Sequence, residues 1–330
     1  MLELFIKKVL IFMSPILLFI GLYIFFDPYK IIYDYGDITN IEDAYLGVNR
    51  DYVTHEKFKL NKELFPYNSF IFGSSRTMAV KTNSWEKFLP EDAIAFSYNT
   101  NGESIYGMYA KIKYLYDNDY PIKNALILLD TDHTFKNPDL ELFHYDYSKY
   151  SWLNFQVKMF MGYSKKAWVP YLSYVLLGVD KELMENYLTF ENDNKTSPKG
   201  NDISNERVKK MISNDSIAYY KKLEDRKEFD LTHEREHLKI KITKEMEAML
   251  REIKSIFDHK KTNYKIVINP LYNKNKFNDQ DIKVLEDIFG KSSIYDFSGE
   301  NDITTDLRNY YESSHFKPSV GERMLKEVYK

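Results

Sequence analysis

Five short apolar runs along the chain have the composition of buried strands. The first three are Ser69–Gly73 (SFIFG), residues 93–98 (AIAFSY) and residues 125–130 (ALILLD), and two more lie at residues 264–269 (YKIVIN) and 293–297 (SIYDF). Helical patterns separate these runs. Strands that are apolar on both faces and alternate with helices are typical of a parallel sheet with helices on each side. The pattern predicts a three-layer α/β domain with functional residues just beyond the carboxyl ends of its strands.

A long interval separates the third run from the fourth. It far exceeds the dozen or so residues that one crossover helix needs, so we expect a helical insertion or cap there. Its aromatic first part, residues 152–178, either packs as helices on the main body or meets the bilayer or a membrane partner. The expected organisation is a membrane anchor (1–30), a connecting segment (31–66), the first part of the core (67–135), the insertion or cap (136–261) and the second part of the core (262–330).

Residues 9–26 form an apolar stretch without a charge. As a helix this stretch is about 27 Å long, enough to cross a hydrocarbon core. Lys7 and Lys8 precede it and acidic residues dominate the segment that follows, which predicts a single-pass membrane protein with a cytoplasmic N-terminus and an extracytoplasmic main domain. The alternatives are a cleaved signal peptide, although no small-residue cleavage site follows, and a buried helix of a soluble domain.

Composition removes several classes of function. The 330 residues are 44% apolar, which is enough for a sizeable core, and the formal charge of −3 gives no electrostatic reason to expect nucleic acid as a partner. The chain has no cysteine, which excludes disulfides, thiolate metal sites and a cysteine nucleophile.

The first candidate for chemistry is the turn that follows the first apolar run. Gly73, Ser74, Ser75 and Arg76 stand there, and a helix is expected to begin directly after them. Glycine allows a sharp bend, and a serine at the helix N-terminus can present its hydroxyl at the carboxyl edge of the sheet. Ser75 is therefore a candidate nucleophile, with an ordinary helix N-cap as the alternative.

The second candidate lies before the last helix, which is expected to begin near Pro318. Glu312 precedes His315 by three residues in a polar loop. A neutral imidazole can take the proton of an attacking hydroxyl, and a neighbouring carboxylate holds the required tautomer. His315 is thus a candidate general base oriented by Glu312, with a histidine packed against its neighbours as the alternative.

These two elements together resemble the SGNH/GDSL hydrolase superfamily. Gly73-Ser74-Ser75 matches its Gly-Asp-Ser turn after the first strand, and Glu312-x-x-His315 matches its Asp-x-x-His before the last helix. The resemblance implies a flavodoxin-like parallel sheet, a Ser-His-Glu triad, and no metal or organic cofactor. It also matches Gly102 to the family's second block, so the backbone N–H groups of Gly102 and Ser75 would form the oxyanion hole.

The third block departs from that family. Asp130-Thr131-Asp132-His133 stands where Gly-x-Asn-Asp is expected, so the side-chain amide donor is missing. An ionised Asp132 would repel a developing oxyanion, whereas His133 offers a donor in its place. We therefore expect Ser74, Arg76 and Asp132 near the site, with His133 as a further oxyanion donor.

Within the superfamily, this sequence is most similar to extracytoplasmic proteins that work beside membrane-bound O-acyltransferases. The similarity lies in the Gly-Ser-Ser-Arg turn, the N-terminal anchor and the ending from Ser314 to Gly321. Examples are the alginate O-acetylation proteins and the D-alanyl transfer protein of lipoteichoic acid synthesis. The resemblance implies a serine esterase or O-acyltransferase that acts on acyl groups of a cell-surface polysaccharide or other polymer, with a membrane-bound O-acyltransferase as partner. The alternative is a non-catalytic scaffold of the same fold that binds the polymer or that enzyme.

One competing motif indicates a metalloenzyme. His233-Glu234-Arg235-Glu236-His237 fits the H-E-x-x-H pattern, in which two histidines on one helix face bind zinc. The surrounding segment is charged almost throughout, which favours a solvated helix face over a rigid metal site. No metal is therefore expected at the active site.

Overall fold

The computed structural model describes residues 2–38, 46–47, 49–139, 143–184, 188, 196–226 and 240–330, with the backbone alone for residues 162–168. The chain divides into two compact units. One consists of Met1–Val48 and Tyr150–Asn194, and the other of Asn49–Lys149 and Lys195–Lys330. The predicted insertion is thus shared between the two units, and the predicted connecting segment contributes a helix to the larger one.

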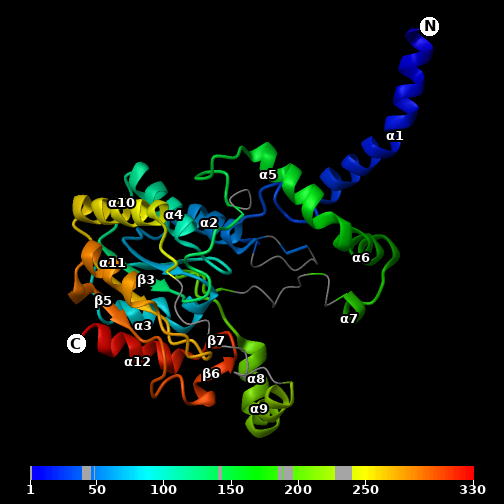
Figure 1. Ribbon diagram of the computed structural model, residues 1–330. Coiled ribbons are helices and arrows are strands. Elements are labelled where there is room, and N and C mark those ends of the chain that lie inside the picture. Colours follow the sequence, from blue (N-terminus) through cyan, green and yellow to red (C-terminus); the bar gives the residue numbers. More distant parts are fainter. Residues whose placement is uncertain are drawn as a thin grey trace. The chain divides into compact units, whose positions relative to one another are not determined.

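The larger unit is built on a five-stranded parallel sheet (Figure 1). Its strands lie in the order β2-β1-β3-β4-β5, which is the doubly wound order 2-1-3-4-5 of flavodoxin-like sheets. The parallel α/β sheet expected from the five apolar runs is confirmed, with boundaries shifted by two residues at most. The strands are β1 (Ser69–Gly73), β2 (Ala95–Asn99), β3 (Asn124–Leu129), β4 (Asn263–Ile268) and β5 (Ile294–Asp296).

Helices cover both faces of this sheet. One apolar core contains side chains of α4, α10 and α11, and the second contains side chains of α3 and α12. Successive strand residues alternate between them, since Phe70 and Phe72 of β1 join the first core and Ile71 joins the second. The helices of this unit are α2 (Arg50–Asn61), α3 (Thr82–Glu86), α4 (Ile105–Asp117), α8 (Glu206–Asn214), α9 (Ser216–Asp225), α10 (Lys244–Lys260), α11 (Asp279–Phe289) and α12 (Pro318–Val328).

Short elements complete the carboxyl edge of the sheet. A 3₁₀ helix, η2 (Ser75–Ala79), directly follows β1. Near the C-terminus, β6 (Tyr310–Glu312) and β7 (His315–Phe316) pair as an antiparallel hairpin before α12. Two further 3₁₀ turns are η5 (Lys291–Ser293) and η6 (Leu307–Asn309).

The smaller unit contains the apolar N-terminal helix α1 (Leu2–Phe26). It is long and apolar enough to cross a membrane, with a mean hydropathy of 2.6 over its most apolar window. Only its end is packed, where the Tyr23 ring contacts Phe160 at 5.1 Å and its hydroxyl reaches Gln156. The other helical elements are α5 (Trp152–Lys158), a π-helical turn η4 (Met159–Tyr163), α6 (Ser164–Leu177) and α7 (Lys181–Met184).

Gly321 lets α12 pack directly on the backbone of η2. A Cβ added there would lie 2.0 Å from the Ala79 carbonyl oxygen, far inside van der Waals contact. We expect Gly321→Ala to lower the free energy of unfolding by about 2 kcal/mol through overpacking, measured by denaturant titration of the full chain. Ser319→Ala, on an exposed position of the same helix, is the control and is expected to stay within about 0.5 kcal/mol of wild type. Equal losses in both variants would contradict this account.

Candidate active site

The nucleophile turn is held tightly against the sheet. A Cβ added at Gly73 would lie 2.9 Å from Thr77 Cγ2 and 3.0 Å from Leu128 Cβ, so only glycine fits between η2 and β3. Ser74 caps η2 by accepting the Arg76 N–H at 3.2 Å, and Ser75 is the first residue of that helix. The N-cap alternative considered for Ser75 therefore belongs to Ser74. The Ser75 hydroxyl is free of the capping role.

His315 reaches this hydroxyl from the β6–β7 hairpin. The His315 Nε2 atom lies 2.8 Å from Ser75 Oγ, across 240 positions of sequence. On the other side of the ring, His315 Nδ1 contacts Glu312 Oε1, and the Ser314 N–H donates to Glu312 Oε2 at 2.6 Å. Because Glu312 and His315 face each other in the hairpin register, the tight turn fixes their pairing. The structure thus brings Ser75, His315 and Glu312 into one hydrogen-bonded chain.

The electrostatics of these three hydrogen-bonded side chains suit a proton relay. Burial alone would raise the pKa of Glu312, but the hydrogen bond and charge of His315 outweigh burial and hold that pKa below its ordinary value. An ionised Glu312 accepts the proton of His315 Nδ1, which leaves the Nε2 lone pair to accept the Ser75 O–H. The geometry can therefore withdraw a proton from Ser75 and return it to a leaving group.

Two tyrosines of the insertion support the hairpin from behind. The Tyr219 hydroxyl donates to the Tyr311 carbonyl at 2.9 Å, and the Tyr220 hydroxyl donates to the Tyr310 carbonyl at 2.7 Å. Both come from α9. No sequence motif predicts this role, because a tyrosine pair in a polar segment has no pattern that distinguishes a hydrogen-bonding pair from surface residues.

Arg76 connects three segments around the site. Its Nε donates to the Ser314 carbonyl at 2.8 Å, beside His315. Its two terminal nitrogens donate to the Asp132 carboxylate at 2.7 and 2.9 Å, and Nη1 also lies 3.0 Å from Asp130 Oδ2. The guanidinium is buried, so this fork is held in place by its surroundings.

The pairing with Arg76 changes the expectation that Asp132 would repel a developing oxyanion. Burial alone would raise the pKa of Asp132, but the hydrogen bonds and charge of Arg76 lower it below its ordinary value. Its negative charge is therefore matched by a buried cation and does not stand free against an oxyanion. Asp130 is satisfied on its other side by Asn269 Nδ2 at 2.7 Å. The departure from the third-block pattern is thus part of an ion-paired network.

The candidate oxyanion donors lie on two loops at the same sheet edge. Gly102 follows β2 in a left-handed conformation, with φ of +60°, and a Cβ added there would meet no atom within 4 Å. Its backbone therefore borders open space. The His133 side chain is half exposed, with Nε2 3.5 Å from Asp132 Oδ2. The oxyanion roles of Gly102 and His133 stay predictions.

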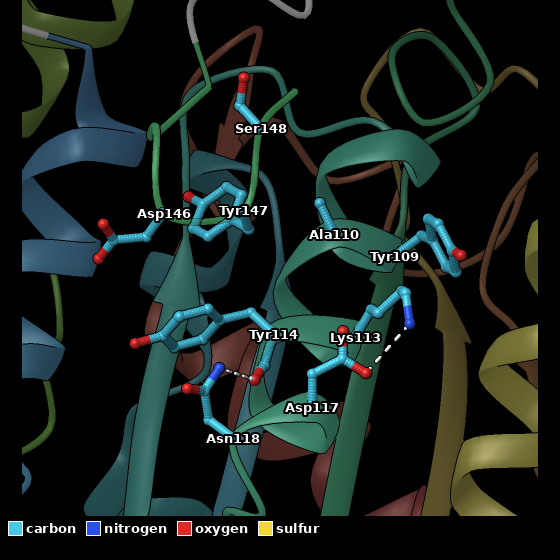
Figure 2. A pocket seen from close by; sticks show the side chains of 9 residues that line it. All are labelled: Tyr109, Ala110, Lys113, Tyr114, Asp117, Asn118, Asp146, Tyr147 and Ser148. Atoms are coloured by element: carbon cyan, nitrogen blue, oxygen red, sulfur yellow. Dashed lines mark hydrogen bonds and ion pairs between the residues drawn. The ribbon is translucent and has the colours of Figure 1, made fainter. Parts of the chain in front are cut away.

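A cavity of about 300 Å³ opens elsewhere on this unit, along the outer side of α4 (Figure 2). None of its lining residues belongs to the Ser75, His315 and Glu312 chain, so it is distinct from the candidate ester site. It is lined by Tyr109, Ala110, Lys113, Tyr114, Asp117, Asn118, Asp146, Tyr147 and Ser148.

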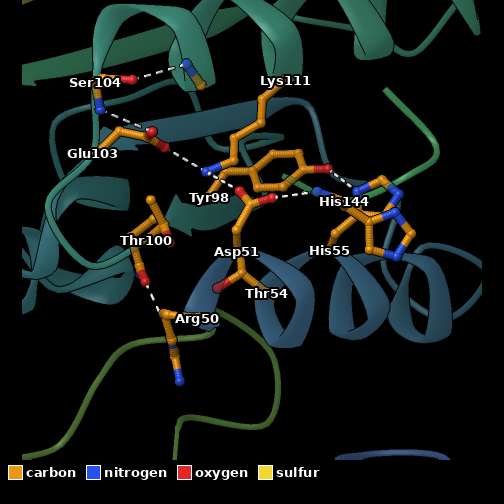
Figure 3. A network of polar contacts seen from close by, with 12 residues as sticks. Arg50, Asp51, Thr54, His55, Tyr98, Thr100, Glu103, Ser104, Lys111 and His144 are labelled. Atoms are coloured by element: carbon orange, nitrogen blue, oxygen red, sulfur yellow. Dashed lines mark hydrogen bonds and ion pairs between the residues drawn. The ribbon is translucent and has the colours of Figure 1, made fainter. Parts of the chain in front are cut away.

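A buried charge network holds the turn that carries Gly102 (Figure 3). Lys111 is fully buried, with its ammonium 2.8 Å from Asp51 Oδ1 and in contact with Glu103. The other oxygen of Glu103 accepts the Ser104 N–H at 3.1 Å. Burial raises the pKa of Glu103 against the lowering effect of Lys111. Because Glu103 follows Gly102 directly, this network sets the path of the backbone at the predicted oxyanion turn.

The H-E-x-x-H motif, which indicated a zinc site as the competing interpretation, lies in a segment that the structure does not describe. His233 and His237 lie outside the described residues, so their arrangement carries no structural argument.

No family model matches this sequence, and no curated protein is significantly similar to it, so the case for Ser75, His315 and Glu312 rests on their geometry.

Proposed function

We propose that this chain is an extracytoplasmic serine esterase or O-acyltransferase of the SGNH type, acting on acyl groups of a cell-surface polysaccharide or other polymer. One observation carries the proposal: the hydrogen-bonded chain from Ser75 through His315 to Glu312. The position of its members adds support, since the serine follows the first strand of a parallel sheet and the histidine precedes the last helix.

The reaction would proceed in two steps, the acylation of Ser75 and its deacylation. Ser75 Oγ attacks the ester carbonyl while His315 Nε2 takes the hydroxyl proton, and the backbone N–H groups of Ser75 and Gly102 would stabilise the oxyanion. The alcohol leaves with the proton from His315, and the acyl group stays on Ser75. Water or an acceptor hydroxyl then attacks the acyl-serine and transfers its own proton to His315, which returns a proton to Ser75 Oγ as the bond from Oγ to the acyl carbon breaks. Throughout, Glu312 orients the ring and stabilises the imidazolium.

The smaller unit supports the membrane part of the proposal. Besides α1, it exposes large apolar side chains on α5 and α6, with Leu153, Val169 and Leu177 each more than 60% exposed. Exposed apolar side chains that lie together mark membrane or protein contact surfaces. We infer that α1 anchors the chain and that this unit contacts the bilayer or a membrane-bound O-acyltransferase.

The test uses the full chain in mild detergent. We expect hydrolysis of p-nitrophenyl acetate and labelling by a serine-reactive fluorophosphonate, with both signals dependent on Ser75. A scaffold protein would give neither signal. Labelling that persists without the Ser75 hydroxyl would overturn the assignment of the nucleophile.

Glu312→Gln tests the orienting carboxylate. The amide keeps the size of the side chain but removes the charge that stabilises imidazolium, so we expect the esterase kcat to fall by roughly 10²–10⁴-fold with little change in KM. Steady-state kinetics with p-nitrophenyl acetate measure this. Glu300→Gln replaces an exposed carboxylate of the same C-terminal region and should leave kcat unchanged. Equal kcat values in the two variants would remove Glu312 from the relay.

A further inference from the structure

A second group of chemically capable side chains lies apart from Ser75. His55 of α2 and His144 of the segment after β3 are completely buried, and their rings are 4.2 Å apart. Asp146 completes the group with a partly exposed carboxylate. One nitrogen or oxygen from each of the three residues lies within 4.8 Å of the other two. We propose that His55, His144 and Asp146 bind a divalent transition-metal cation, with Zn²⁺ as the preferred ion.

The spacing of the donor atoms fits a compact cation. Asp146 Oδ2 lies 2.9 Å from His55 Nε2 and 3.8 Å from His144 Nδ1. Ligands of a tetrahedral zinc site, with bonds near 2.0–2.1 Å, are about 3.3 Å from one another. These two spacings bracket that value, and all the donor atoms lie within 4.8 Å of one another, so small movements of the three side chains would bring the donors to bonding distance.

Outer contacts orient both rings toward Asp146. His55 Nδ1 contacts the Tyr98 hydroxyl, and His144 Nε2 lies 2.8 Å from Glu56 Oε1. Metal-binding histidines commonly have their second nitrogen held by a carboxylate or other polar group in this way. His144 Nδ1 accepts the Asp146 backbone N–H at 3.1 Å, which shows that this nitrogen carries a lone pair on the side of Asp146.

Three existing contacts have to yield when the cation binds. The first is the 2.9 Å hydrogen bond between His55 Nε2 and Asp146 Oδ2, which gives way when both atoms bind the cation. The Lys59 ammonium lies 3.0 Å from Asp146 Oδ2 and 3.0 Å from Glu56 Oε1. Its side chain is one-third exposed, so it can leave Asp146 and keep its pairing with Glu56. The hydrogen bond from the Asp146 backbone to His144 Nδ1 is the third contact, and coordination of the Nδ1 lone pair replaces it. The position now filled by an ammonium is thus already suited to positive charge.

The cavity beside α4 would give the cation a route of entry, because one of the three proposed ligands, Asp146, lines it. Asp146 and Tyr147 form part of its wall, and the Tyr114 ring that also lines it packs edge-on against His55 at 4.7 Å (Figure 2). Two imidazoles and one carboxylate are the donor set that zinc prefers over magnesium or calcium, which take oxygen ligands. The fourth position would hold water facing the cavity.

The test measures metal content of the full chain in mild detergent. After chelator treatment and incubation with Zn²⁺, we expect about one zinc per chain by inductively coupled plasma mass spectrometry. Asp146→Asn and His144→Gln should each lower this ratio at least fivefold. Asp117→Asn changes another carboxylate of the same cavity and should leave it unchanged. The double variant His233→Ala/His237→Ala separates this site from the H-E-x-x-H motif and should also keep its zinc.

Two further readouts keep the result interpretable. Wild type should gain on the order of 5 °C in Tm with excess Zn²⁺, and Asp146→Asn should not. Co²⁺ in place of zinc should give the visible absorption of a tetrahedral site, lost in Asp146→Asn. Fluorophosphonate labelling of Ser75 reports folding and the proposed esterase independently of metal content. Zinc bound equally by wild type and Asp146→Asn, zinc lost only in the double histidine variant, or no zinc in wild type would each overturn the proposal.

Discussion

Ser75→Ala is expected to abolish fluorophosphonate labelling and to lower kcat for p-nitrophenyl acetate by at least about 10³-fold. The reason is the position of its Oγ, 2.8 Å from His315 Nε2, the nitrogen that would take its proton. Alanine removes the only atom that forms the acyl-enzyme bond, so no neighbouring group compensates. His315→Ala should cause a loss of similar size, because members of such a relay act as a unit and their effects are not additive.

The controls for this prediction lie beside the mutated residues. Ser313→Ala removes an exposed hydroxyl from the hairpin turn and should retain full labelling. Ser74→Ala removes the cap of η2 and should reduce stability by about 1 kcal/mol while leaving the labelled residue in place. Labelling in the Ser75→Ala variant at the wild-type rate would show that another nucleophile reacts. Unlabelled wild type with a normal unfolding transition would instead favour the scaffold alternative.

The sheet could be predicted because three of its strands, β1, β2 and β3, are buried on both faces. A continuous run such as residues 125–130 leaves little choice but a central strand, and β1 to β4 were found where such runs occur. The hairpin of β6 and β7 was read as a loop, because strands of two and three residues are too short to show alternation. Burial alone does not decide which strands can be predicted, since β6 is more buried than β5, which the sequence does predict.

Helix α2 shows why other parts of the fold were missed. Its buried residues include Arg50, Asp51, His55 and Lys57, so its inward face is polar and the usual apolar periodicity is absent. Such a helix is stabilised by specific partners, including Lys111 and His144, that come from distant segments. A single sequence gives no indication of those partners, and the cluster of His55 with His144 was missed for the same reason.

The candidate site was predicted in part. The order of Ser75 after a strand and His315 before the last helix was enough to propose their pairing. Asp132 was judged by its own charge, as a residue that would repel an oxyanion. Its partner Arg76 lies 56 positions away in sequence, and only the packing of η2 against the loop after β3 brings the two together. Pairings of this kind require three-dimensional information.

Arg76→Met is expected to lower the free energy of unfolding by about 3–5 kcal/mol at pH 7, the loss typical of breaking a buried ion pair. Methionine fills much of the volume but leaves Asp130 and Asp132 without their cation. Arg76→Lys keeps the charge and loses the bidentate fork, so it should be intermediate. Denaturant titration of the full chain measures the loss, and Arg308→Met, at an exposed arginine, is the matched control.

The pH dependence of the unfolding free energy distinguishes loss of the ion pair from loss of packing contacts. In wild type, the pKa of Asp132 is lowered, so its stabilising contribution is complete above the ordinary value of 3.8 and is lost as the pH falls through the lowered value. In Arg76→Met, the main effects that oppose burial are lost, so the pKa of Asp132 rises and protonation on acidification relieves the unpaired charge. The difference in unfolding free energy between wild type and variant should therefore be largest near pH 7 and shrink by pH 4.5. A difference that stays constant over this range would assign the loss to packing.

Because Arg76 also holds the Ser314 carbonyl beside His315, the ion-pair account further requires slower labelling of Ser75 in folded Arg76→Met at pH 7.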